Sequence, residues 1–343
     1  MRTTPLRIVA VLGAAAACAA ALAGCGSTSS STASSSTGAS PSGSAAASAV
    51  GAPSATATTF PMTVTAENGA VAIKAKPSRI ISLSPTATED LYAVGAGGQV
   101  VAVDQDSNYP AAAPRTSLSG LTPNIEAIAK YNPSLVVASE NTGGLVSGLA
   151  KLGVPVLIEP AVATLGAAYA QIQQVGQATG HAAQAVSVTT SMKRQILAAV
   201  DKAGPHQGTT YYWEVSANPF YSATSATIMG QLAGLFGLKD IADQADKPAD
   251  GGYPELTQEY IVAARPQVIF LADNQPSDGG QTPAIVAHRP GWSDIPAVQH
   301  HAVIGLNDDI ASRWGPRLPQ LVTEIAQGIE QAAAAQPSTS PAP

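Results

Sequence analysis

The chain has 343 residues, of which 45% are hydrophobic and 12% charged, with two cysteines and a formal net charge of −6. A chain of this length can bury one large or two medium hydrophobic cores. Its acidic balance lacks the basic footprint of a nucleic-acid binder, so we expect no nucleic-acid partner.

The first 24 residues have the features of a secretory signal peptide. Arg2 and Arg7 form a charged start, and a short run rich in Ala, Leu and Val follows. The run ends in Leu-Ala-Gly-Cys at Cys25, which resembles the lipobox of bacterial lipoproteins. We therefore predict removal of residues 1–24 and a lipid on Cys25. An ordinary signal peptide, cleaved near Ala23 without lipid, is the alternative.

Processing at Cys25 has consequences for chemistry and location. Cys18 would leave with the signal peptide, so the folded part would hold no thiol for a disulfide, a zinc site or a nucleophile. Loss of Arg2 and Arg7 takes two from the 17 basic residues and moves the formal charge from −6 to −8. Membrane attachment is then expected from the lipid alone, with no polybasic patch. The predicted location is extracytoplasmic, anchored to the cell membrane.

Segments of low complexity flank the expected folded part. Residues 25–58 consist mainly of Ser, Ala, Thr, Gly and Pro, and no charged residue occurs between Arg7 and Glu67. Such a composition does not bury enough apolar surface to offset the entropy lost on ordering. We predict a disordered tether over residues 25–58 and a disordered tail over residues 332–343.

Short apolar runs predict the β-strands. A hairpin is expected first, over residues 60–77, because Asn68-Gly69 marks a tight turn between two alternating segments. The later runs are apolar on both faces, which is typical of parallel strands covered by helices. They lie at residues 79–84, 99–104, 134–139, 155–160, 209–216, 267–272 and 302–307.

Helix signals lie between most of these runs. Thr86 and Glu89 have the spacing of a capping box, and Gly95 ends the same pattern. Residues 181–203 show one unbroken helical pattern in the middle of the chain. At about 1.5 Å per residue such a helix spans on the order of 35 Å, which is enough to pass from one lobe to another.

This order of elements predicts an α/β protein with two three-layer lobes, each on a mainly parallel sheet. We expect an N-terminal lobe over residues 59–165, a linking segment over 166–203 with one long backbone helix, and a C-terminal lobe over 204–331. A two-lobed α/β chain presents strand ends and loops to the crevice between its lobes. Residues after strand ends are therefore the candidates for a binding site.

One phrase is written twice, once in each lobe. NIEAIAKYNPSLVVA begins at Asn124, and TQEYIVAARPQVIFL begins at Thr257. In register, each has a capping residue first, a glutamate third (Glu126 and Glu259) and a proline tenth, and then continues as an apolar strand. A carboxylate in a first helical turn stabilises the helix by about 0.3–1 kcal/mol. The two glutamates are thus explained either as helix starts or as paired surface features.

A family resemblance rests on several motifs in a fixed order. They are RIISLSPTATEDLYAVGAG, SNYP, the first copy of the repeat, LGVPVLI, the long helix and SRWGPRLPQLVTEIA. Together they resemble the iron-siderophore and vitamin B12 substrate-binding proteins of ABC importers over residues 60–331. The resemblance implies a lipoprotein with two α/β lobes joined by a rigid helix, which holds a metal chelate in the cleft and delivers it to a permease and its ATPase.

The same resemblance implies further properties. Members of that family move little on ligand binding, because one helix rather than crossing strands joins their lobes. The ligand carries its own iron or cobalt, so the protein needs no cofactor and no metal-ligating residues. One surface glutamate on each lobe forms a salt bridge with permease arginines, and Glu126 and Glu259 match these positions. We expect a monomer.

Signals for catalysis are weak. VGAGGQV at residues 94–100 follows a helix and precedes a strand, whereas a dinucleotide-binding loop follows a strand and begins a helix. No GxSxG, HExxH or Walker sequence occurs. For the adjacent His300 and His301 a turn is a better explanation than a metal site. We expect no enzyme. A chelatase-like enzyme and a ligand-free signalling or scaffold lipoprotein are the alternatives.

Ten residues are predicted to contact the ligand, because they follow strand ends or lie in crevice loops. They are Ser84, Tyr109, Glu140, Asn141, Tyr221, Tyr253, Asp273, Asp308, Arg313 and Trp314. The aromatic members suit a large amphipathic chelate.

Several of these candidates have another explanation. Ser84 is equally well explained as a helix cap. Tyr109 matches a ligand-contacting tyrosine of cobalamin binders in the resemblance, with packing in a turn as the alternative. Tyr221 and Tyr253 would otherwise face solvent. Arg317 is interpreted as structural, with a backbone or carboxylate partner.

Charge narrows the ligand class. The nominated loops hold Glu140, Asp273, Asp308 and a single arginine, Arg313. Desolvating a strongly anionic tricatecholate siderophore beside carboxylates would be costly. We therefore predict a neutral or cationic ligand of the ferric hydroxamate type, with a corrinoid or haem as alternatives. The tryptophans found in the first lobe of cobalamin binders are absent here, since all three lie at positions 213, 292 and 314.

Overall fold

The computed structural model describes residues 58–275 and 280–335. The predicted signal peptide, the lipidation site Cys25, all but the last residue of the tether (25–58) and residues 336–343 of the tail lie outside the described residues. The tail prediction is wrong for residues 332–335, which continue the last helix. In the part that is described, no helix is both long enough and apolar enough to cross a bilayer.

The described chain begins with the predicted hairpin. Strands β1 (Met62–Ala66) and β2 (Gly69–Ile73) pair antiparallel around the Asn68-Gly69 turn. The Asn68 side chain fixes this turn to strand β6 (Val156–Ile158) of the N-terminal lobe. Its amide donates to Val156 O at 3.0 Å, and its oxygen accepts from Ile158 N at 3.1 Å. The hairpin prediction is confirmed.

The sheet of the N-terminal lobe has four parallel strands in the order β4-β3-β5-β6. Every residue of β3 and β5 is buried, as expected for strands that helices cover on both faces. The strands are β3 (Ile80–Leu83), β4 (Val100–Val103), β5 (Leu135–Ala138) and β6 (Val156–Ile158). The helices of this lobe are α1 (Pro85–Ala93), α2 (Ile125–Ala129) and α3 (Leu145–Ala150), with short 3-10 turns η1 (Gly97–Gln99) and η2 (Thr142–Gly144).

The start of α1 confirms the helix-cap explanation of Ser84 and corrects the capping box predicted at Thr86 and Glu89. Ser84 caps the helix and its hydroxyl accepts from Ala87 N, whereas the sequence pattern placed a capping box at Thr86 and Glu89. Pro85 explains the shift, since proline suits the first helical position and lies directly after Ser84. Glu89 therefore does not cap this helix, and its side chain instead takes part in contacts between the lobes.

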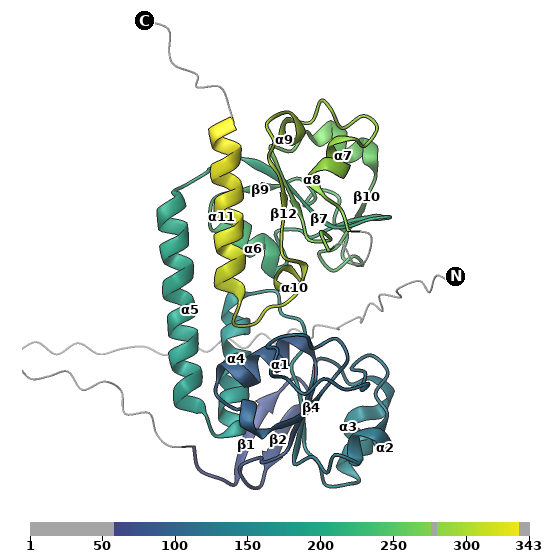
Figure 1. Ribbon diagram of the computed structural model, residues 1–343, viewed down its shortest axis with the longest axis vertical. Coiled ribbons are helices and arrows are strands. Elements are labelled where there is room, and N and C mark those ends of the chain that lie inside the picture. Colours follow the sequence, from purple (N-terminus) through teal and green to yellow (C-terminus); the bar gives the residue numbers. More distant parts are fainter. Residues whose placement is uncertain (1–57, 276–279, 336–343) are drawn as a thin grey trace, which may run out of the picture. The chain divides into compact units, whose positions relative to one another are not determined.

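Two helices form the linking segment. Helix α4 (Leu165–Thr179) is followed by α5 (Ala182–Ala203), the long helix that the sequence predicted. Helix α5 packs against α4 and against α11 (Leu318–Ala335), as Figure 1 shows. Just before α5, His181 Nε2 lies 3.0 Å from Gln99 Oε1 of the N-terminal lobe. Just after it, His206 N donates to Phe236 O of the C-terminal lobe, so α5 joins the two lobes.

The sheet of the C-terminal lobe has six strands and mixed direction. Its order is β10-β8-β7-β11-β12, with β9 paired to β7. Strands β7, β9, β11 and β12 pair in parallel, while the short β8 pairs antiparallel with both of its neighbours, β7 and β10. Their bounds are β7 (Thr210–Ala217), β8 (Phe220–Ser222), β9 (Lys239–Asp240), β10 (Glu255–Leu256), β11 (Val268–Leu271) and β12 (Val303–Gly305). The other helices are α6 (Ile228–Gly234), α7 (Gln258–Ala264), α8 (Pro283–Ala287), α9 (Pro296–Gln299) and α10 (Asp308–Ala311).

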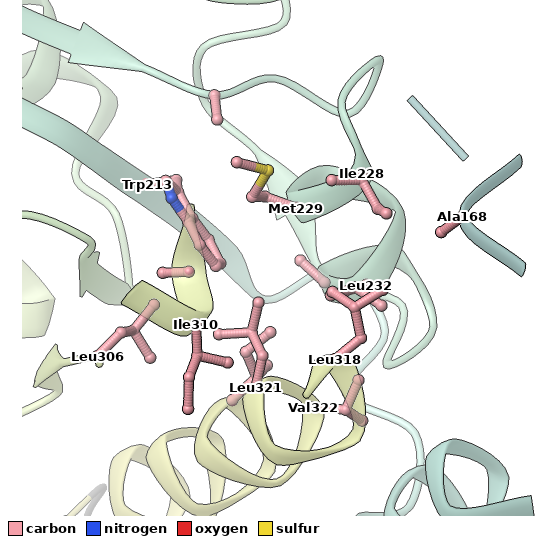
Figure 2. Packing of buried hydrophobic residues seen from close by; sticks show 14 of the residues in the cluster. Ala168, Trp213, Ile228, Met229, Leu232, Leu306, Ile310, Leu318, Leu321 and Val322 are labelled. Carbon is pink, nitrogen blue, oxygen red and sulfur yellow. The ribbon is translucent and has the colours of Figure 1, made fainter. Parts of the chain in front are cut away.

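Large apolar side chains fill the core between this sheet and its helices. Trp213 of β7 is fully buried beside Phe270 of β11, with the ring centroids 5.5 Å apart. Figure 2 shows Leu321 of α11 and Leu232 of α6 in the same cluster. Because α11 also contacts α5, this core fixes the linking helix to the C-terminal lobe.

The repeated phrase forms the same structure in both lobes. Asn124 accepts from Ala127 N and Thr257 accepts from Tyr260 N, so each caps its helix as predicted. The ninth residue of each copy adopts a left-handed backbone, with φ of 48° at Asn132 and 49° at Arg265. Each copy then enters a buried parallel strand.

The contact between α4 and α5 can be tested at a glycine. A Cβ added at Gly176 would lie 2.3 Å from Ala185 Cβ, whereas one at Gly166 of the same helix would meet nothing nearer than 3.9 Å. We expect Gly176→Ala to lower the free energy of unfolding by about 1–3 kcal/mol through overpacking. The matched Gly166→Ala should be neutral or stabilising by up to about 1 kcal/mol. Urea unfolding of both variants measures this, and equal effects would contradict the packing.

Candidate functional site

A pocket of about 480 Å³ lies where loops of the two lobes meet. We call it the interlobe pocket. Most of its lining side chains are polar, and they come from both lobes. From the N-terminal lobe they are Ser84, Pro85, Thr86, Gln105, Asp106, Asn108, Arg115 and Ser139, and from the C-terminal lobe Gln275, Asp308, Asp309, Ser312, Arg313 and Trp314.

Strand ends position the N-terminal half of the pocket. Ser84 follows β3 directly, Ser139 follows β5, and Gln105 follows β4 after one residue. Since β3, β4 and β5 are parallel neighbours, their carboxyl ends meet at one edge of the sheet. This edge forms one wall of the pocket.

The start of α10 positions the C-terminal half. Asp308 accepts hydrogen bonds from Asn274 N at 2.9 Å and from Gln275 N at 2.7 Å. These bonds hold the loop after β11 against α10. Burial raises the pKa of Asp308 above its usual value, although the backbone donors oppose this effect.

Four charged side chains connect the lobes next to the pocket, and we call them the interlobe cluster: Glu89, Asp309, Arg313 and Arg317. Glu89 Oε1 accepts from Arg313 Nη1 at 2.9 Å and from Arg317 Nη2 at 2.6 Å. Arg317 Nε also donates to Glu89 Oε2 at 2.8 Å, and Arg313 Nη2 donates to Asp309 Oδ1 at 2.8 Å. Burial lowers the pKa of Arg317, but the hydrogen bonds and charge of Glu89 outweigh that effect and raise it.

Further contacts between the lobes surround the cluster. Asn108 Nδ2 donates to Asp309 Oδ2 at 2.7 Å, and the Arg317 guanidinium lies 4.4 Å from the centre of the Tyr109 ring. On the side of the linking helices, Trp314 Nε1 donates to Gln171 Oε1 at 3.0 Å. The pocket walls from the two lobes are therefore tied together by direct bonds.

The structure brings only part of the predicted ligand set into the pocket. Ser84, Asp308, Arg313 and Trp314 line it, while Tyr109 is 45% exposed beside the lining residue Asn108.

The other predicted contacts lie outside the pocket lining. Glu140 and Asn141 are exposed, and Asn141 Oδ1 accepts from Val146 N. Tyr221 is half-buried on β8, and Tyr253 packs against the core. Asp273 lines a neighbouring pocket of about 440 Å³ that shares Asp308 with the interlobe pocket.

One charge prediction needs correction. The pocket contains a second arginine, Arg115, so Arg313 is not its single arginine. Arg313 lines the pocket as predicted, but it also bonds to Glu89 and Asp309 and is only 9% exposed, which was not expected from the sequence. The structural interpretation of Arg317, with a carboxylate partner, is confirmed by its ion pair to Glu89.

Several residues that line the pocket were not nominated from the sequence, which contains only weak indications of their position. Gln105 and Asp106 follow a predicted strand end, and Ser139 precedes the nominated Glu140, so the strand-end rule pointed close to them. Arg115 and Asn108 lie in the loop between β4 and α2, where no periodic pattern gives a side chain's direction.

The pocket is more acidic than basic. Asp106, Asp308 and Asp309 stand against Arg115 and Arg313, and no histidine lines the pocket. Over residues 58–275 and 280–335 there is no group of three or more His, Cys, Asp or Glu side chains that could hold a metal ion. His301 has a φ of 55° in the turn before β12, so the turn explanation for this histidine pair is confirmed.

Two carboxyl groups that are not part of the interlobe cluster, Asp90 and Glu159, are buried in the N-terminal lobe. Burial raises the pKa of Asp90 well above its usual value, and the charges of Glu159 and Glu89 add to the effect. Burial likewise raises the pKa of Glu159 from 4.5 to about 8. In the neighbouring pocket burial raises the pKa of Asp273 to about 7, with the charge of Glu214 as the next cause.

Glu126 and Glu259 occupy matching positions on the surface. Each is exposed and lies in the first turn of its helix, α2 or α7. Both therefore have the helix-start role, and both are accessible to a partner.

Comparison with known proteins identifies the class of this molecule. The family model described as "Periplasmic binding protein" matches residues 80–310, so the chain belongs to that family. It is a substrate-binding protein of an ABC importer that acts outside the cytoplasm, and members of this family are solute-binding proteins rather than enzymes.

Particular relatives are moderately similar. An uncharacterized ABC transporter substrate-binding lipoprotein of Bacillus subtilis, YvrC, is 31% identical over 79% of this chain and 86% of its own length. The vitamin B12 binding protein BtuF of Vibrio cholerae has a TM-score of 0.63 and 25% identity, over 75% of this chain and 98% of that one. The heme-binding protein RhuT of Roseiflexus sp. RS-1 has a TM-score of 0.64 and 26% identity, over 75% and 99%.

The raised pKa of Glu159 predicts a pH-dependent stability. From pH 4.5 to about 8 the folded protein keeps a proton on this carboxyl that the unfolded chain has released, so stability falls as pH rises through this window. Glu159→Gln cannot ionise and should show a shallower fall and a higher free energy of unfolding at pH 8. Urea unfolding across this range checks it, with the exposed Glu140→Gln as control. A slope equal to that of the wild type would contradict the assignment.

Proposed function

We propose that the interlobe pocket binds a neutral or cationic metal chelate, of the ferric hydroxamate type, and that the protein delivers this chelate to its ABC permease. The metal belongs to the cargo, so the protein contributes polar contacts to the chelate. We further propose that a lipid on Cys25 keeps the receptor at the cell membrane and that the receptor acts as a monomer.

The charge of the pocket carries this proposal. Its three aspartates outnumber its two arginines, and one of those arginines is already bonded to carboxylates. An anion would lose its hydration beside these aspartates with few donors to replace it, which is costly. A neutral or cationic chelate avoids this penalty and presents oxygen and nitrogen atoms to the serine, asparagine and glutamine side chains of the walls.

A corrinoid is the second candidate, and similarity supports it. The Vibrio cholerae protein of 25% identity is described as binding vitamin B12. Trp314 offers aromatic surface in the pocket lining for such a ligand, and Tyr109, next to the lining residue Asn108, is 45% exposed. A haem is a weaker candidate, because the pocket lining contains no histidine and few apolar side chains.

Glu126 and Glu259 are proposed to dock the receptor on the permease. One exposed glutamate lies on each lobe, at the start of equivalent helices. Basic side chains of a permease would pair with both, so that the receptor is held at two points. Two weak contacts that engage together bind more tightly than either alone.

A panel of ligands tests the cargo. Trp314 should report binding by fluorescence quenching, because it lines the pocket while Trp213 and Trp292 are buried. We expect ferrichrome or ferrioxamine to quench with a submicromolar Kd, and a ferric tricatecholate to show no binding below about 1 µM. Trp314→Phe should remove most of the signal. Nanomolar binding of the tricatecholate, or tight binding of cobalamin or haem alone, would contradict the hydroxamate assignment.

A double substitution tests docking. Glu126→Ala with Glu259→Ala should leave ligand affinity unchanged, since neither residue lines the pocket. Transport should fall by roughly tenfold or more, because truncating a charge paired across an interface costs about 2–5 kcal/mol. Uptake of radiolabelled chelate in cells measures this, with the exposed pair Glu140→Ala and Glu255→Ala as control. Uptake at the wild-type level would show that docking uses other residues.

A further inference from the structure

The interlobe cluster contains two guanidinium groups next to the pocket, yet the pocket is acidic. Arg313 is part of the pocket wall, and Arg317 lies four residues further along the chain, directly before α11. Both donate to the same carboxylate, Glu89, whose side chain is only 1% exposed. One buried acid therefore binds both cations, and it shares Arg313 with Asp309.

We propose that Glu89 is a positioning residue that sets the charge selectivity of the pocket by occupying Arg313. The inference rests on the proposed function, because it concerns the class of ligand that the same pocket accepts. Glu89 contacts no ligand itself, since it does not line the pocket. It acts through Arg313, which lines it.

The geometry supports this role. Arg313 Nη1 is directed to Glu89 Oε1 at 2.9 Å, and Arg313 Nη2 to Asp309 Oδ1 at 2.8 Å. Both terminal nitrogens are thus bonded to carboxylates. Arginine recognises an anion best through two parallel donors, and here these donors are already used.

Glu89 also supports a residue next to the pocket lining. It holds Arg317 through two hydrogen bonds, and Arg317 lies over the ring of Tyr109. Loss of the Glu89 charge would therefore release Arg313 and loosen the support of Tyr109. The pocket would change from a site for neutral or cationic chelates toward one in which Arg313, in addition to Arg115, is available to an anion.

Glu89→Gln is the direct test, because glutamine keeps the shape and one acceptor oxygen while the charge is removed. Affinity for a ferric tricatecholate should rise by about tenfold, the effect of one charge-assisted hydrogen bond. Affinity for neutral ferrichrome should stay within about threefold of the wild type, which a general loss of structure would not allow. The gain should shrink as salt increases.

Three further variants complete the test. Glu214→Gln is the matched control, since Glu214 is fully buried and also forms a paired contact with an arginine, Arg289, that does not line the pocket. It should give no gain for the tricatecholate. Adding Arg313→Gln to Glu89→Gln should abolish the gain. If Glu89→Gln does not fold, Asp309→Asn frees one donor of Arg313 at a site that is 27% exposed and should give a smaller gain.

The outcomes separate the two proposals. An equal gain in Glu214→Gln, a gain that survives Arg313→Gln, or no gain in either Glu89→Gln or Asp309→Asn would overturn the role of Glu89. Tight binding of the tricatecholate by the wild type would instead contradict the proposed ligand class, and the ratio between variant and wild type would still measure the effect of Glu89.

Discussion

The structure depends on one buried carboxylate that faces two guanidinium groups from the other lobe. Breaking such a buried pair by removing one partner typically costs about 3–5 kcal/mol, because a charge is left without compensation. Glu89 comes from α1, whereas Arg313 and Arg317 precede α11. Separating the lobes would break the three hydrogen bonds that Glu89 accepts from these two arginines. The ion pairs therefore favour one arrangement of the pocket walls over alternatives in which they part.

The helices support the same arrangement from the opposite side. Helix α5 packs on α4 and α11, and α11 is fixed to the C-terminal sheet by the core around Trp213 (Figures 1 and 2). The Trp314 to Gln171 bond joins this helical layer to the pocket. Packing on one side and ion pairs on the other thus act on the same short segment before α11, which carries both Arg313 and Trp314.

Regular elements followed from the sequence because their signals are local. Apolar runs, capping residues and the Asn68-Gly69 turn depend on neighbours within a few positions, and all seven predicted strands are present. The short β8, β9 and β10 were missed, since a two- or three-residue strand has no periodicity. The role of Glu89 was missed for a different reason. Its partners are 224 and 228 residues away in the chain, and its spacing from Thr86 suggested a capping box instead. Among the site residues, strand ends located Ser84 and Asp308, but not the loop residues Asn108 and Arg115.

The firm joining of the lobes has a kinetic consequence for an importer. If the distance between Glu126 and Glu259 hardly depends on whether the pocket is filled, then the empty and the filled receptor offer a permease almost the same outer surface. Both forms would then compete for it by mass action. Cells with a large excess of receptor over chelate would import more slowly than cells with less receptor, because empty molecules would occupy the permeases.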